Sequence, residues 1–86
     1  MIRPEGLDDR EILALRRLEP GSRARVVHLA PAEPEQLLRL SNLGLVPGVL
    51  IELRQMRPAA IIAIGETQIA LDPEITEGVW VKRVDT

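Results

Sequence analysis

The stretch that decides the fold is residues 37–48, which read Leu-Leu-Arg-Leu-Ser-Asn-Leu-Gly-Leu-Val-Pro-Gly. Its leucines indicate a helix, and the glycine at position 44 indicates where that helix ends. With Leu43 as the C-cap, Gly44 takes the left-handed conformation, where a side chain is unfavourable. Leu45 can then fold back onto Leu40, the apolar contact that accompanies this type of helix ending.

The same stretch also predicts how the chain leaves the helix. Pro47 fixes φ and Gly48 supplies a positive φ, so the pair favours a type II turn that leads into a strand. We expect the leucines of the stretch to be buried in the core, so that replacing them unfolds the domain. The positions that define the fold are Leu40, Leu43, Gly44, Leu45, Pro47 and Gly48.

The composition of the chain limits its class. Its 86 residues are enough for one small domain, and Trp80 is the only aromatic residue in a chain that is 45% apolar. Cysteine is absent, which excludes disulfides and thiolate metal sites. The longest apolar runs are far shorter than the about 20 residues that span a bilayer. The N-terminus has Glu5, Asp8 and Asp9 close behind Met1 and lacks the apolar core of a signal peptide. We therefore expect a cytoplasmic protein with no direct membrane insertion.

The charge pattern argues against nucleic acid as a partner. The chain has 11 basic and 13 acidic residues and a net charge of −2, whereas phosphate-binding domains concentrate positive charge on one surface. We favour the interpretation that these charges are ordinary solvated surface charges. The alternative is that scattered basic residues meet in space and form a basic patch for nucleic acid. The residues that would have to meet are Arg16, Arg17, Arg23, Arg25, Lys82 and Arg83.

The hydrophobic pattern predicts about five short strands, with one helix inserted after the first strand. A short helix to about Arg17 is a further expected element, with Asp8 as its cap, Glu11 three residues on and Leu7 packed on Ile12. Strands are expected at residues 24–29, 49–54, 60–64, 67–71 and 79–84, a helix at 34–43, and a single helical turn at 72–77. Short strands leave exposed edges unless the sheet closes, which favours a small, partly open β-barrel.

This order of elements resembles the FeoA family, whose members are small SH3-like barrels associated with bacterial ferrous iron uptake. The resemblance covers roughly residues 15–84 and divides the chain into an N-terminal extension, 1–14, and a barrel domain, 15–86. It departs from the family pattern at Arg57-Pro58, where similar proteins often have Gly-Pro. The residues that carry it are Leu18-Glu19-Pro20-Gly21, Ala24, Val26, the Leu40 to Gly48 signature, Ile69-Ala70-Leu71, Val79 and Val81.

The resemblance implies a non-enzymatic accessory protein that docks on the cytosolic part of the FeoB-type, GTPase-containing iron transporter. It also relates the chain to the C-terminal domain of iron-dependent repressors of the diphtheria toxin repressor type. A free-standing regulatory domain that senses metal or contacts a transcription factor is therefore an alternative function. A self-assembling structural module is another, and the sequence leaves the oligomeric state open.

Residues that could carry chemistry are few. His28 is the only histidine, and Glu33 and Glu35 are the nearest carboxylates that could join it as metal ligands. One imidazole with carboxylates is a poor ferrous site without further ligands, so we expect no metal site and no cofactor. No serine or threonine stands in a motif that pairs it with a base, so we expect no enzymatic activity.

Trp80 is the candidate centre of a partner surface. If Val79 and Val81 point into the barrel, strand alternation sends Trp80 outward, and tryptophan is enriched at interface hot spots. The alternative is that the N-terminal helix buries Trp80 with Ile12 and Leu15. The candidate surface consists of Trp80, Lys82, Val84, Leu50, Met56 and Ile61.

Overall fold

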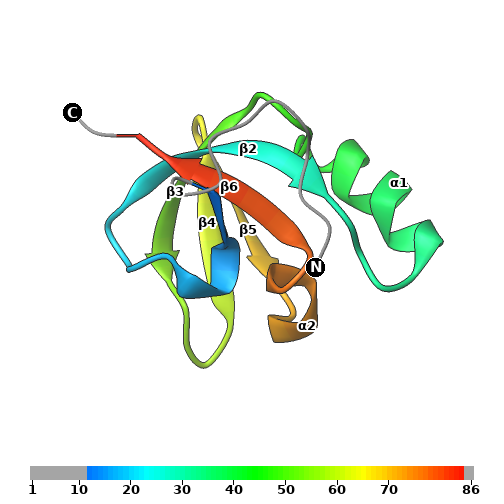
Figure 1. Cartoon of the computed structure of the whole chain (residues 1–86). Helices are drawn as coiled ribbons and strands as arrows, with labels where there is room; N and C mark the ends of the chain where they lie inside the picture. Colours follow the sequence, from blue (N-terminus) through cyan, green and yellow to red (C-terminus); the bar gives the residue numbers. More distant parts are fainter. Residues whose placement is uncertain (1–11, 85–86) are drawn as a thin grey trace.

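The computed structural model describes residues 12–84, and Figure 1 shows a β-barrel with one helix to its side. The strands are β1 (Ile12–Ala14), β2 (Arg23–Leu29), β3 (Leu50–Gln55), β4 (Ala60–Ile64), β5 (Thr67–Leu71) and β6 (Val79–Arg83). The helical elements are the 3₁₀ turn η2 (Leu15–Arg17), the helix α1 (Pro34–Asn42) and the single turn α2 (Pro73–Thr76). The later strands and both α-helices therefore lie where the sequence predicts them, within one or two residues.

All the neighbouring strands are antiparallel and form one sheet of 6 strands in the order β1-β6-β2-β3-β4-β5. The sheet curls around an aliphatic core and leaves β1 and β5 as its two edges, as in a partly open SH3-like barrel. The predicted fold class is confirmed. The structure adds one strand, β1, to the about five that the sequence pattern predicts.

The expected N-terminal helix is wrong for the described residues. Residues 12–14 form β1, which pairs with β6, and only Leu15–Arg17 is helical, as one 3₁₀ turn. The physical reason is that β6 offers an unpaired edge, and Ile12 and Ala14 can cover the outer face of β6 while Leu13 faces the core. Sheet pairing together with this burial outweighs a local helix preference, which is weak. The predicted cap and staple at Leu7, Asp8 and Glu11 lie outside the described residues.

Strand alternation places the core. In β3, Ile51 and Leu53 are at most 1% exposed, whereas Leu50 faces solvent. The core contains no aromatic side chain and is built from aliphatic residues on β2 to β6, together with α1, α2 and the loops. Its largest fully buried apolar side chains are Leu15, Leu40, Leu45, Ile51, Leu53, Ile62, Val26, Val79 and Val81.

The predicted helix stop is confirmed. The N–H of Leu45 donates to the carbonyl of Leu40 at 3.0 Å, and the N–H of Gly44 donates to that of Ser41 at 2.9 Å. Gly44 has φ of 93°, and Leu40 and Leu45 are both fully buried. These are the two hydrogen bonds and the apolar contact of a Schellman motif. The helix therefore ends with a single leucine, Leu40, inserted into the core.

The turn that follows is also as predicted. Gly48 has φ of 97°, and the N–H of Val49 donates to the carbonyl of Val46 at 3.2 Å, which closes the turn. The N–H of Gly48 donates to the carbonyl of Val26 at 2.7 Å, so the turn is fixed onto β2. This pairing sets the position at which β3 begins.

Two glycines should respond differently to substitution by alanine. A Cβ at Gly44 would meet no atom within 4 Å, so Gly44→Ala should lower the free energy of unfolding by only about 1 kcal/mol, the conformational penalty of a left-handed residue. A Cβ at Gly78 would lie 2.4 Å from the carbonyl oxygen of Ala30. Gly78→Ala should therefore lower it by about 3 kcal/mol or more. Urea unfolding measures both, and an equal or smaller loss for Gly78→Ala would contradict this packing.

Candidate partner-binding surface

The large apolar side chains that the described residues expose all come from one stretch of the chain. They are Leu37 (43% exposed), Leu38 (68%), Leu43 (43%), Val46 (38%) and Leu50 (36%), and we call them the exposed apolar segment. The stretch covers α1, its C-terminal turn and the start of β3. This corrects the expectation that the leucines of residues 37–48 are core, since only Leu40 and Leu45 are buried.

Helix geometry explains why α1 buries so little. Pro34 occupies the first turn, where its missing N–H is harmless, and the helix continues to the Schellman stop. Leu40 is the only residue of α1 that is buried. Leu38 is two residues away, about 200° around the axis, so it points away from the barrel. Figure 1 shows α1 beside the barrel, with no other helix of the described residues against it. A small barrel can therefore cover only a narrow stripe of this helix.

Arg25 borders the exposed apolar segment on the barrel side. It lies opposite Leu50 in the pairing of β2 with β3, and its guanidinium donates to the carbonyl of Gly48 at 2.8 Å. On the helix, Glu35 in the first turn and Arg39 in the last turn are both exposed. The rim therefore carries charge of both signs around an apolar centre, the usual layout of a protein-binding surface.

Trp80 is not part of an exposed surface. It faces outward from β6 as alternation predicts, but it is only 8% exposed because Ile12 and Ala14 of β1 pack beside it, with Val27 at the margin. A bulge in β2 between Val26 and His28 accompanies the placement of Val27 on this outer face. The expectation of an exposed Trp80 is wrong. The alternative, burial of Trp80 by Ile12 and Leu15 of an N-terminal helix, is confirmed for Ile12, which covers the ring from the strand β1 and not from a helix. It is wrong for Leu15, which lies in the main core.

The other residues of the expected surface do not gather around Trp80. Lys82 and Leu50 both lie opposite Arg25, on either side of β2, so these two share one row of the outer face. Met56 packs against the main core, and Ile61 lies opposite Gln55 and Ala70 towards the far edge of the sheet. Val84, which follows β6, is partly buried. Of the six, Leu50 alone has a side chain among the exposed large apolar residues.

The weak metal candidates are all at the surface. His28 lies opposite Trp80 near the end of β2, Glu33 is the N-cap of α1 and Glu35 is in its first turn; all three side chains are exposed. Among residues 12–84, no three histidine, aspartate or glutamate side chains are grouped so that they could hold a metal ion.

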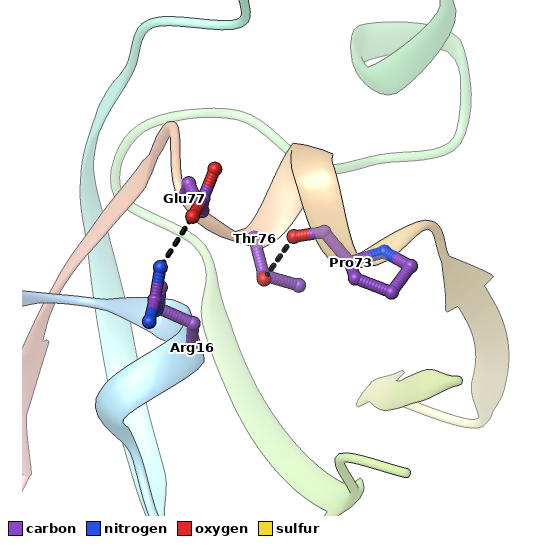
Figure 2. Close-up of polar contacts among 4 residues, drawn as sticks. All are labelled: Arg16, Pro73, Thr76 and Glu77. Carbon is purple, nitrogen blue, oxygen red and sulfur yellow. Dashed lines mark hydrogen bonds and ion pairs between the residues drawn. The ribbon is translucent and has the colours of Figure 1, made fainter. Parts of the chain in front are cut away.

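Two depressions flank one ion pair. The first, of about 340 Å³, lies between the β3–β4 turn and α2, and the second, of about 580 Å³, lies beside β1 and Trp80. Arg16 and Glu77 form an ion pair that lines both of them (Figure 2). The one buried hydroxyl nearby, on Thr76, donates to the carbonyl of Pro73 at 2.6 Å and is not paired with a base.

Within residues 12–84, every helix is too short or too polar to cross a lipid bilayer.

The curled antiparallel sheet around an aliphatic core defines a small SH3-like domain. The sequence model of the FeoA domain family matches residues 13–83, and the chain therefore belongs to the FeoA family. No curated protein sequence matches it.

Solved structures share this fold. The chain is similar to a crystal structure described as an iron uptake regulatory protein, FeoA, with 23% identity and a TM-score of 0.76, covering 85% of this chain and 97% of that one. It is similar to the FeoA protein of Chlorobium tepidum, with 28% identity and a TM-score of 0.78, covering 85% of this chain and 71% of that one. It is also similar to a manganese-dependent transcriptional repressor, with 16% identity and a TM-score of 0.77, but this chain spans only 42% of the repressor's length.

The burial of the leucines leads to a contrast that can be measured. Leu40→Ala should lower the free energy of unfolding by about 3 kcal/mol, because it leaves a cavity beneath the helix stop. Leu38→Ala, at a side chain that is 68% exposed, should change it by less than about 0.5 kcal/mol. Both are read from urea unfolding followed by circular dichroism. Equal destabilisation by the two substitutions would mean that Leu38 is a core residue after all.

Proposed function

We propose that this chain is a cytoplasmic, non-enzymatic accessory protein of bacterial ferrous iron uptake. In this proposal it docks on the cytosolic part of a FeoB-type, GTPase-containing transporter and so affects the assembly or activity of the transporter. Membership of the FeoA family supports a role in ferrous iron transport or its regulation. The likeness to a repressor is below the identity that would transfer a function, and it supports the shared fold alone.

The observation that carries the docking proposal is the exposed apolar segment. Leu37, Leu38 and Leu43 are exposed by 43%, 68% and 43%. Outside the exposed apolar segment, every large aliphatic side chain that the structure describes is at least partly buried. Several large apolar side chains exposed together mark interaction sites in single-domain proteins. Leu43 lies directly before Gly44, so its place is set by the helix stop. The binding face is thus held by the same motif that anchors the helix to the barrel.

Polar replacement of the helix leucines should weaken binding to the transporter. We expect Leu37→Gln and Leu38→Gln each to reduce affinity about tenfold, since each would remove a desolvated apolar contact. The measurement is binding of the purified protein to detergent-solubilised full-length transporter and to its isolated cytosolic GTPase domain, with and without nucleotide.

Thr67→Ser is the control, because Thr67 is an exposed residue of β5, outside the exposed apolar segment, and the change is between polar side chains. Its affinity should equal that of the unaltered protein. No association with either form of the transporter would rule out direct docking. Association that is insensitive to Leu37→Gln and Leu38→Gln would leave docking standing but assign it to a different surface.

A further inference from the structure

The strand β5 is an unprotected edge of the sheet. Among residues 12–84 its one strand partner is β4, and in the order of the described strands nothing follows it. The opposite edge, β1, is only 3 residues long, and the exposed Arg16 and Arg17 follow it after Leu15. Short length and charge are devices that keep an edge from pairing with another chain. β5 has 5 residues, Thr-Gln-Ile-Ala-Leu, with neither charge nor proline among them.

The register of the hairpin shows which backbone groups of β5 are unpaired. Ile64 and Thr67 flank the two-residue loop and form a hydrogen-bonded pair, and in antiparallel strands such pairs alternate with non-bonded ones. Ile69 and Leu71 therefore also bond to β4, while the N–H and C=O groups of Gln68 and Ala70 point outward. Both residues are exposed, and no other backbone or side-chain group of residues 12–84 bonds to their main chains.

Acidic side chains stand at both ends of this edge. Glu66 precedes β5 in the hairpin loop, and Asp72 and Glu74 follow it at the start of α2. All three are exposed, and none has an ion-pair partner among the described residues. An uncharged row of main-chain donors and acceptors is thus bounded by negative charge at each end.

From this arrangement we infer that the β5 edge binds an extended segment of another protein by strand addition. The segment becomes a seventh, antiparallel strand bonded to Gln68 and Ala70, and basic residues at its ends meet Glu66 at one end and Asp72 at the other. Main-chain bonds supply the affinity in this mode of recognition, and the flanking charges supply the selectivity. The inference does not rest on the proposed transporter docking, which uses a different surface.

A second copy of this chain fits the edge poorly. In a symmetric antiparallel pair centred on Ile69, Gln68 of each copy would bond to Ala70 of the other. The same register would place Glu66 of one copy opposite Asp72 of the other at both ends, because the two acids are equally far from Ile69. Like charges directly opposite each other destabilise a sheet. The charge at the ends therefore selects a basic segment and opposes self-pairing.

The test uses a synthetic peptide of alternating threonine and valine, five residues long, with an arginine added at each end and both termini blocked. It is titrated into the full-length protein labelled with ¹⁵N. The amide signals of Gln68 and Ala70 should shift most, and hydrogen exchange at these two amides should slow by about tenfold at saturation. No shift at these two amides overturns the inference.

Ala70→Pro removes an outward N–H without removing a bond to β4, and edge strands tolerate proline. It should weaken peptide binding about tenfold, while Ala70→Val, which keeps the N–H, should not. Circular dichroism checks that both variants are folded. The same loss is expected with the unaltered protein when the edge-facing amides of the peptide are N-methylated, which keeps the test valid if Ala70→Pro fails to fold. Equal binding by a peptide with glutamate in place of its terminal arginines would overturn the role of the acidic ends.

Discussion

The Schellman motif at Gly44 determines which side chains of α1 are buried in the core and which are exposed. Its two hydrogen bonds, from Leu45 to Leu40 and from Gly44 to Ser41, close the C-terminal end of α1. Leu40 and Leu45 are inserted into the core, and the N–H of Gly48 in the next turn bonds to the carbonyl of Val26 in β2. Since Leu40 is the one buried residue of the helix, the other leucines of the stretch face solvent. The same motif therefore completes the core and creates the exposed apolar segment.

The local chemistry of turns and strands is readable from the sequence in this chain. Glycine at the helix stop and the Pro47-Gly48 pair each specify backbone angles that few other residues adopt, and the structure has positive φ at both Gly44 and Gly48. Strand alternation also predicts that Ile51 and Leu53 share one face, because side chains in a strand alternate with a period of two, and both are buried in the core. Local rules of this kind are sufficient for most of the barrel.

Burial that depends on distant partners is harder to predict. Strand alternation places Trp80 on the outer face of β6. It is buried there because β1 pairs with β6, and Ile12 and Ala14 of β1 pack against it. Leu37 and Leu38 are residue types that are usually buried. They are exposed because the nine-residue helix α1 packs only one of its side chains, Leu40, into the barrel core. Family resemblance supplied the fold and the setting in iron uptake, whereas the exposed apolar segment, which we propose as the binding surface, followed from the three-dimensional packing.

Hydrogen–deuterium exchange of the full chain, measured with and without a FeoB-type transporter reconstituted in nanodiscs, tests the central claim most directly. If α1 and its C-terminal turn form the contact surface, slower exchange on binding should be confined to residues 34–50, with the β1 and β6 amides around Trp80 unchanged. Protection centred on the β1 and β6 strands, or no protection anywhere in the chain, would contradict it.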